Sequence, residues 1–179
     1  MFKFIKLREE HLEMVLNWRT KESVTKYMNT DIEYNLDNQK KWFEKISSSK
    51  AEKYWIIYFQ NKPIGLISLN DIDYYNRRTR WGYYMGEDEY RMYGAIIPHY
   101  LYYYVFIILE LNKINAEVLE GNDNVLKLNL IHGYREIGVF KEHIYKYNKF
   151  HDLYLIELTK ENWVKAVKRP EKYIAEFEL

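Results

Sequence analysis

One strand–loop–helix stretch in the middle of the chain constrains the fold more than any other feature. A strand-like run at residues 80–85 leads through a short polar loop with Arg91 and Gly94 into a long apolar helix at residues 95–109. A loop at a helix start presents unpaired backbone N–H groups and the positive end of the helix dipole, which suit a phosphate group. Arg91 adds a forked positive charge, and Gly94 lets the backbone approach a ligand closely. The stretch predicts a phosphate-binding loop, although a plain strand-to-helix turn has the same pattern.

Composition excludes several kinds of function. Lys and Arg number 27 against 26 Asp and Glu, a formal net charge of +1, so we expect no general nucleic-acid surface. The chain has no cysteine, which excludes disulfides, thiolate chemistry and Cys-ligated zinc. We also expect no bound metal, because the histidines lack the spacing of a metal site; they are His11, His99, His132, His143 and His151.

The apolar segment at residues 95–109 raises the question of a membrane span. It is shorter than a bilayer requires, and it contains Pro98 and His99. A buried core helix with Pro98 in its first turn fits better, because the missing N–H costs little there. No basic start with an apolar run follows Met1, so we expect a cytoplasmic protein without a secretory signal or a membrane partner.

Strands and helices alternate along the chain without a linker-like stretch, so we expect a single domain over residues 1–179. Periodicity predicts strands at residues 2–6, 54–59, 64–72, 80–85 and 114–119, and a hairpin of 139–145 and 153–158 around 147–149. It predicts helices at 9–18, from an Asn35 cap to about 48, at 95–109, from an Asn122 cap to Gly133, and from 160 onward. Residues 21–34 are polar and irregular. This order predicts an α/β fold in which helices flank a mixed, mostly antiparallel sheet.

The loop after the fourth strand carries the first motif. The chain has no G-x-G-x-x-G and no P-loop lysine motif, which argues against a Rossmann domain. The loop reads Arg91-Met92-Tyr93-Gly94-Ala95-Ile96. It resembles the coenzyme A pyrophosphate motif of the GNAT acetyltransferase superfamily, which has Arg or Gln, two residues, Gly, one residue, and Gly or Ala. Ile96 departs from the small residue expected there. The resemblance covers nearly the whole chain and implies a GNAT fold that binds acetyl-CoA through these six residues.

A second block, residues 122–134 (NDNVLKLNLIHGY), resembles the segment of the family in which an Asn opens a helix and Gly-Phe or Gly-Tyr closes it. The resemblance implies that Asn122 bonds the pantetheine arm of the coenzyme and that Lys127 lies near its phosphates. A plain helix cap and a solvated lysine are the simpler interpretations. The family also splays its fourth and fifth strands apart, so the backbone of Tyr83, Tyr84 and Met85 would bind the arm.

Two residues are candidates for proton transfer. The amine acceptor must react unprotonated, so a base is useful, and Glu117 stands on a strand where a buried charge is costly without a function or a partner. A paired structural carboxylate is an equally good interpretation. Asn129 occupies the position at which the family usually carries a tyrosine, or a histidine in some members, to protonate the leaving thiolate. An amide has no dissociable proton in the useful range, so Asn129 can only donate a hydrogen bond. His132 could act instead if it shares the helix face of Asn129.

The acceptor is indicated by resemblance. Residues 17–20, 26–28, 42–43, 68–72 and 143–158 are together similar to acetyltransferases of the pseudaminic acid pathway, which acetylate the free amine of a UDP-linked 4-amino-4,6-dideoxy sugar. Arg19 is a candidate for binding the pyrophosphate, because a guanidinium binds phosphate oxygens in a bidentate manner. Tyr27 and Trp42 are candidates for stacking on uracil or sugar, although a core anchor is the more usual role of a tryptophan like Trp42.

Three other functions stay open at this point. One is acetylation of a protein N-terminus, as in the ribosomal-protein branch of similar architecture. Another is acetylation of a polyamine, which would favour an acidic acceptor groove. A non-catalytic coenzyme A-binding domain is the third, and the amide at Asn129 supports it. The sequence also leaves a homodimer open.

Overall fold

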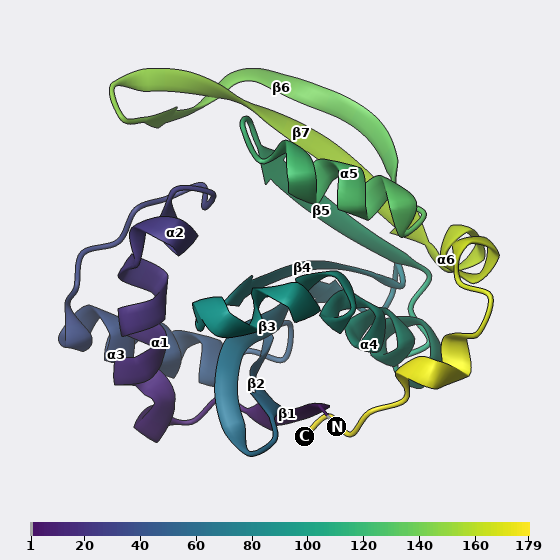
Figure 1. The fold of residues 1–179 in the computed structure, drawn as a ribbon, viewed down its shortest axis with the longest axis horizontal. Coiled ribbons are helices and arrows are strands. Elements are labelled where there is room, and N and C mark those ends of the chain that lie inside the picture. Colours follow the sequence, from purple (N-terminus) through teal and green to yellow (C-terminus); the bar gives the residue numbers. More distant parts are fainter. Residues whose placement is uncertain (1) are drawn as a thin grey trace.

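The computed structural model describes residues 2–179, whose strands form one seven-stranded sheet (Figure 1). In chain order they are β1 (Phe2–Lys6), β2 (Lys53–Phe59), β3 (Lys62–Asp73), β4 (Arg78–Met85), β5 (Lys113–Leu119), β6 (Arg135–Lys146) and β7 (Lys149–Thr159). Their order across the sheet is β1-β2-β3-β4-β5-β7-β6. Only β4 and β5 run parallel among these described neighbours. The prediction of a mixed, mostly antiparallel sheet flanked by helices is confirmed.

The helices group around the sheet in two places. α1 (Leu12–Thr20), α2 (Glu22–Thr25) and α3 (Leu36–Ser47) lie together on the left in Figure 1, whereas α4 (Ile97–Tyr103) and α5 (Asp123–Ile131) lie over the central strands. The shorter pieces are η1 (Glu9–His11), η2 (Asp88–Ala95), η3 (Tyr104–Ile108), α6 (Lys160–Ala166) and η4 (Pro170–Tyr173). Asn35 caps α3 as predicted, because its side chain accepts the backbone N–H of Asn38 at 3.0 Å.

Side chains that alternate along a strand build a separate core on each face of the sheet. On β2, Ile56 packs in the cluster that contains Leu12 and Val15 of α1. Its neighbour Ile57 packs in the larger cluster, which contains Leu101 of α4. Successive residues of a strand point to opposite faces, so one strand supplies both cores. The sheet is therefore covered on both faces, with α1 and α3 on one and α4 on the other.

The segment predicted as one long helix, residues 95–109, has three parts. Residues 88–95 form the 3₁₀-helix η2, α4 begins only at Ile97, and residues 104–108 form the wider π-helix η3. Pro98 explains the late start, because it has no N–H to donate to the carbonyl of Gly94 four residues earlier. That carbonyl accepts the Tyr83 hydroxyl instead, at 2.7 Å. The prediction of a continuous helix is therefore wrong at its start and in its last turn.

Two further differences concern the end of the molecule where α2 lies. The hairpin of β6 and β7 is longer than predicted at both strands and turns through Tyr147 and Asn148, with φ of 53° and 57°. Such paired positive φ angles are those of a two-residue hairpin turn. In Figure 1 the hairpin extends leftward over the molecule toward α2. Residues 21–34, predicted as irregular, contain the one-turn helix α2.

Candidate active site

β4 and β5 separate soon after they pair. Their parallel register joins Arg78 to Lys113, Thr79 to Ile114 and Arg80 to Asn115, and no later pair is formed among the described residues. Residues 81–85 keep β3 as their partner on the other side. The edge of β4 that faces β5 is therefore open there, and its backbone groups can bind an extended ligand. The splaying that the resemblance implied is present.

The loop that follows β4 is held by the end of α1. Trp18 lies flat against Gly86, and a methyl group on Gly86 would overlap its ring. The indole N–H of Trp18 donates to Glu87 Oε1 at 2.6 Å, and Lys21 Nζ donates to the Gly86 carbonyl at 2.6 Å. Trp18 is thus a buried anchor that fixes where the loop leaves the sheet.

The predicted phosphate loop is the 3₁₀-helix η2. Arg91 is exposed and pairs with Asp88 at 2.9 Å, so its guanidinium is on the surface. A Cβ placed on Gly94 would have only the Tyr83 hydroxyl nearby, at 3.5 Å, so the backbone there is accessible. Tyr93 packs on Phe59 with ring centroids 4.7 Å apart. The remaining residues of the motif, Met92, Ala95 and Ile96, are exposed.

Helix α5 carries three of the predicted residues. Asn122 is the N-cap residue of α5, as predicted, but its side chain accepts no capping hydrogen bond within residues 2–179. It starts the helix through its carbonyl, which accepts the N–H groups of Val125 and Leu126, and its amide stays available to a ligand. Lys127 is exposed, and Asn129 is buried at 4% exposure.

His132 ends α5 and packs against another histidine. Its ring centroid lies 4.2 Å from that of His99 on α4. Burial, and then the neighbouring His99, lower the pKa of His132 to about 4, and burial lowers the pKa of His99 to about 4 as well. Both rings are neutral at neutral pH, so His132 cannot supply the proton that Asn129 lacks.

On the α1 side of the sheet lies a cavity of about 660 Å³. Arg19 of α1 and Trp42 of α3 line its walls, and Tyr84 of β4 lines its floor. The other lining residues are Val15, Leu16, Met28, Thr30, Ile32, Glu33, Asn35, Asn38, Gln39, Tyr54, Leu66, Ser68, Gly82 and Tyr83. The structure therefore brings Arg19 and Trp42 together but not Tyr27, which is 39% exposed beside Lys26 and lies outside the cavity lining.

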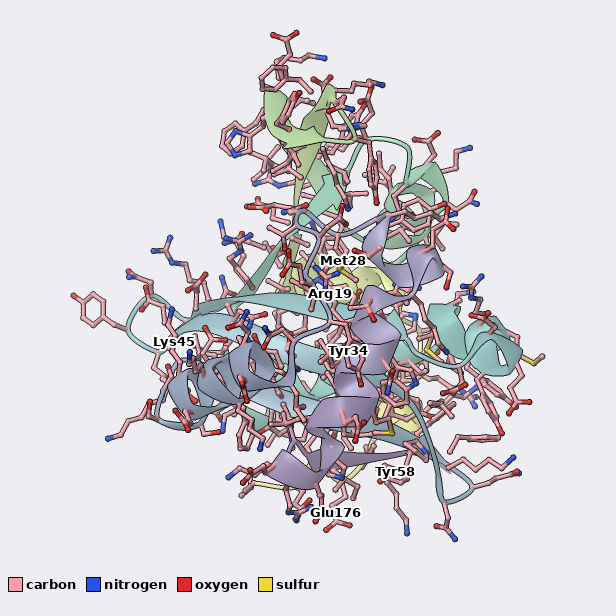
Figure 2. All side chains as sticks on the ribbon, turned by 90° about the vertical axis from the view of Figure 1, so that its left-hand side faces the viewer. Arg19, Met28, Tyr34, Lys45, Tyr58 and Glu176 are labelled. Carbon is pink, nitrogen blue, oxygen red and sulfur yellow. The ribbon has the colours of Figure 1, made fainter. Side chains whose placement is uncertain are left out.

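Arg19 is fixed in the cavity wall by the segment that follows α2. Its guanidinium donates to Thr25 Oγ1 at 3.1 Å and to the Thr30 carbonyl at 2.6 Å. Figure 2 shows Arg19 beside Met28 near the upper end of α1. Burial lowers the pKa of Arg19, and Tyr84 and Asp31 partly oppose this effect. Because the pKa of an arginine is normally far above 7, the guanidinium stays charged at neutral pH. The cavity thus contains a fixed, partly buried cation.

Glu117 of β5 has a partner on each carboxylate oxygen. Arg80 pairs with Oε1 at 2.7 Å, and the Asn29 amide donates to Oε2 at 3.2 Å. Its side chain keeps 22% exposure. Glu117 is thus a satisfied carboxylate where β4 and β5 begin to separate, and the remaining exposure leaves it accessible to water.

Comparison with known families matches residues 2–134 to the acetyltransferase (GNAT) domain. The chain belongs to the GNAT acetyltransferase family. It is therefore an N-acetyltransferase that uses acetyl-CoA.

Individual relatives of this GNAT acetyltransferase agree with that assignment. An uncharacterized N-acetyltransferase p20 of Bacillus licheniformis is 25% identical over 164 residues, 88% of this chain and 92% of the relative. A putative ribosomal N-acetyltransferase, YdaF of Bacillus subtilis, is 31% identical over 109 residues, 60% of this chain and 59% of the relative. The crystal structure of the Vibrio cholerae spermidine N-acetyltransferase with CoA and spermine superposes with a TM-score of 0.84. It is 19% identical and covers 91% of this chain and 98% of its own, so it shows the fold.

The residues around the split fit acetyl-CoA. The open edge of β4 offers backbone groups to an extended arm, and the space at Gly94 admits a close approach to a phosphate. Arg91 is exposed beside it, and the Asn122 side chain has no capping bond within residues 2–179 to lose. The same part of the chain has no cluster of His, Asp or Glu that could hold a metal ion, and no helix long and apolar enough to cross a bilayer.

Several residues of the site were missed at the level of sequence. Arg80 and Asn29, which hold Glu117, come from segments distant from it, and Thr30, which holds Arg19, lies in the irregular segment 21–34. Ser68 belongs to the segment 68–72 that carries the resemblance, but its position on the cavity floor, at 5% exposure, was not predicted.

Proposed function

We propose that this GNAT acetyltransferase acetylates the free amine of a UDP-linked 4-amino-4,6-dideoxy sugar, by direct transfer in a ternary complex. The observation that carries the proposal is the pairing of Arg19 with Trp42 in one cavity beside the open edge of β4. A guanidinium suits a pyrophosphate and an indole suits a flat base or sugar face. The volume of about 660 Å³ is in the usual range for small-molecule sites, roughly 300–1,000 Å³.

The charges of the cavity also favour an anionic acceptor over a polyamine. Arg19 and Glu33 are the charged residues that line it, and Glu33 belongs to the exposed segment before α3. The nearby Asp31 is already paired with Lys146 at 2.8 Å. A polycation would meet the fixed positive charge of Arg19 without several carboxylates to balance it, and like charges at short range repel.

We assign the following roles to the side chains. Acetyl-CoA supplies the acetyl thioester. The backbone of Tyr84 and Met85 at the open edge of β4 binds its arm, and a backbone N–H there polarises the reacting carbonyl. Glu117 accepts the proton of the incoming ammonium through water, because its carboxylate is partly exposed at the start of the split. Asn129 donates a hydrogen bond but no proton.

In this proposal the phosphates of the coenzyme are held on the α4 side of the sheet, opposite the cavity. Arg91 leaves Asp88 for the pyrophosphate, and backbone N–H groups at Gly94, Ala95 and Ile96 bind its oxygens. The side chains of Met92 and Tyr93 flank that loop, and Tyr93 fixes it to β2 through Phe59. Asn122 forms a hydrogen bond to the pantetheine arm. Lys127 lies on the exposed face of α5, so it can contact only a phosphate that lies on the protein surface.

A protein N-terminal amine is the second candidate acceptor. The relative named a putative ribosomal N-acetyltransferase, 31% identical over 60% of this chain, favours it. Only the nucleotide sugar carries a pyrophosphate and a uracil. The two candidates therefore differ in whether the cavity binds UDP, the part of the nucleotide sugar that lacks the amine.

Calorimetry with UDP separates these candidates before any turnover is measured. With coenzyme A present, UDP should bind to one site per chain and should compete with the amino sugar. A peptide that mimics an N-terminus and spermidine are the comparison ligands. Binding of either one, with no heat from UDP, would contradict the proposed acceptor.

A further inference from the structure

Lys146, the last residue of β6, buries its ammonium group almost completely. Its side chain is only 4% exposed. Nζ donates to the carbonyls of Thr25 and Met28 at 2.6 and 2.9 Å, and it pairs with Asp31 Oδ1 at 2.8 Å. An ammonium has three hydrogens, and each has an acceptor here. A charge buried this deeply is stable only when it is fully paired, so these contacts are tightly constrained.

All three hydrogen-bond acceptors belong to residues 25–31. We call these residues the acceptor segment, because the cavity beside them is the proposed site of the acceptor substrate. Two of its members, Met28 and Thr30, line the cavity. Arg19 holds the segment from the α1 side through Thr25 and Thr30, whereas Lys146 reaches it from the hairpin. The Thr25 hydroxyl closes the segment on itself by donating to Asp31 Oδ1 at 2.6 Å. Residues from two distant parts of the chain therefore fix this short stretch.

The contact crosses the split in the sheet. β6 belongs to the half that contains β5 and β7, and the acceptor segment belongs to the half that contains α1 and β4. Asn29 makes a second crossing, since its amide donates to Glu117 of β5 at 3.2 Å. Burial raises the pKa of Asp31, but the hydrogen bonds from Lys146 and Thr25 outweigh it and hold the pKa below its usual value. The carboxylate is therefore ionised, and the pair is an ion pair at neutral pH.

We propose that Lys146 is a positioning residue for the acceptor: it fixes the acceptor segment, and through it the guanidinium of Arg19 in the cavity wall. The inference rests on the proposed function in one respect, that the cavity receives the acceptor. Without the Lys146 ammonium, two carbonyls and the Asp31 carboxylate lose their shared partner, and the segment has to rearrange to reach water. Thr25 and Thr30 are then no longer held in place, so they no longer fix the guanidinium of Arg19.

The effect should fall on the acceptor and spare the coenzyme. The loop at residues 86–95 is held by Tyr83, by Trp18 and by Phe59, and none of these is hydrogen-bonded to Lys146 in the described chain. Replacing a residue with a merely structural role would change both Michaelis constants together, or it would lower the fraction of folded protein. A positioning residue for the acceptor changes one of them.

Lys146→Met tests the proposal, with Lys149→Met as the matched control on the same hairpin. Lys149 is 63% exposed and lies 3.7 Å from Glu120, so it has no part in the acceptor segment. We expect the KM for the acceptor to rise about ten- to hundredfold in Lys146→Met, the size expected for a lost charged hydrogen-bond cluster. We expect the KM for acetyl-CoA to stay within about threefold, whereas kcat should also fall, because Asn29 of the same segment donates to Glu117. Lys149→Met should match the wild type, and Lys146→Arg should recover part of the loss because it keeps the charge.

Hydrogen exchange gives a test that needs no acceptor. Amide protection of residues 25–31 should fall in Lys146→Met but not in Lys149→Met, with thermal unfolding measured to show that both variants are folded. Unchanged protection in folded Lys146→Met would overturn the proposal whatever the acceptor is. An equal rise of both Michaelis constants would also overturn it. Failure of the wild type to turn over a nucleotide amino sugar, with protection lost in Lys146→Met, would contradict only the proposed function.

Discussion

At the scale of single residues, the site depends on which polar groups are tied to the protein and which are free. Arg19 has two partners in the acceptor segment, and Glu117 has one on each oxygen. The Asn122 side chain accepts no capping hydrogen bond within residues 2–179, and Asn129 is buried at 4% exposure. The tied groups define the shape of the cavity, and Asn122 can meet a ligand without losing a capping bond first.

Arg19→Ala should weaken binding of the nucleotide part of the acceptor. We expect the KM for the UDP-amino sugar to rise about ten- to hundredfold, since hydrogen bonds to charged groups are the stronger ones. Arg19→Lys, which keeps the charge but not the fork, should lie between the two. Steady-state kinetics measure this, and an unchanged KM in folded Arg19→Ala would remove the guanidinium from the acceptor site.

Asn129→Ala should keep turnover close to that of the wild type. An amide is no general acid, and a coenzyme thiol, with a pKa near the value of about 8.5 for cysteine, leaves tolerably well without one. Asn129→Tyr supplies a dissociable proton, so kcat should rise by up to ~10²-fold if the ring is accommodated. Kinetics of both variants, with melting curves as a control for folding, decide it. Loss of turnover in Asn129→Ala at unchanged coenzyme affinity would show an active role for the amide.

At the scale of elements, sequence periodicity placed the strands well and failed where a single side chain redirects the backbone. Asn35 and its helix are where a cap and an apolar stripe predict them. The helix after β4 begins later than predicted because Pro98 leaves the Gly94 carbonyl to the Tyr83 hydroxyl, and periodicity contains no information about that partner. The burial of Lys146, which follows the predicted strand 139–145, likewise has no local signal, since its acceptors lie more than a hundred residues away.

Gly94→Asp should abolish most of the affinity for acetyl-CoA. A side chain has room at this position, with only the Tyr83 hydroxyl 3.5 Å from a built Cβ, so the fold should tolerate the change. The new carboxylate would repel the pyrophosphate that we assign to this loop. Gly94→Ala is the matched control, because it adds the Cβ without the charge. Calorimetry should show strong loss in the first variant and a small one in the second, and equal affinities would exclude η2 as the phosphate loop.

At the scale of the whole molecule, two sheet halves meet at a short parallel pairing and are joined again at the hairpin end. The core on the α4 side is closed by a pair of neutral histidines. His99 and His132 face each other, Tyr102 lies edge-on to both, and Tyr173 stacks on His99 at 4.6 Å. Sequence spacing could not bring these histidines together, since they come from two different helices.

The buried histidine pair predicts acid sensitivity of the fold. Burial lowers both pKa values to about 4 from 6.5, so the unfolded chain binds more protons between these values. Stability is therefore complete above about pH 6.5 and falls as the pH drops toward 4, by roughly a few kcal/mol for a pair that titrates together. Urea unfolding at pH 7.5 and 5 measures the loss. His99→Phe should reduce it, whereas His143→Gln, at an exposed position, should leave it unchanged. An unaltered loss in folded His99→Phe would contradict this origin.

The most direct test of the proposed function is release of free coenzyme A thiol with three acceptors at equal concentration. They are a UDP-linked 4-amino-4,6-dideoxy sugar, a peptide with a free N-terminus, and spermidine. We predict that kcat/KM for the sugar exceeds that for the other two by at least ~10²-fold, because Arg19 and the cavity floor discriminate in the transition state as well as in binding. Thiol release with the peptide or with spermidine, and none with the sugar, would contradict the proposal.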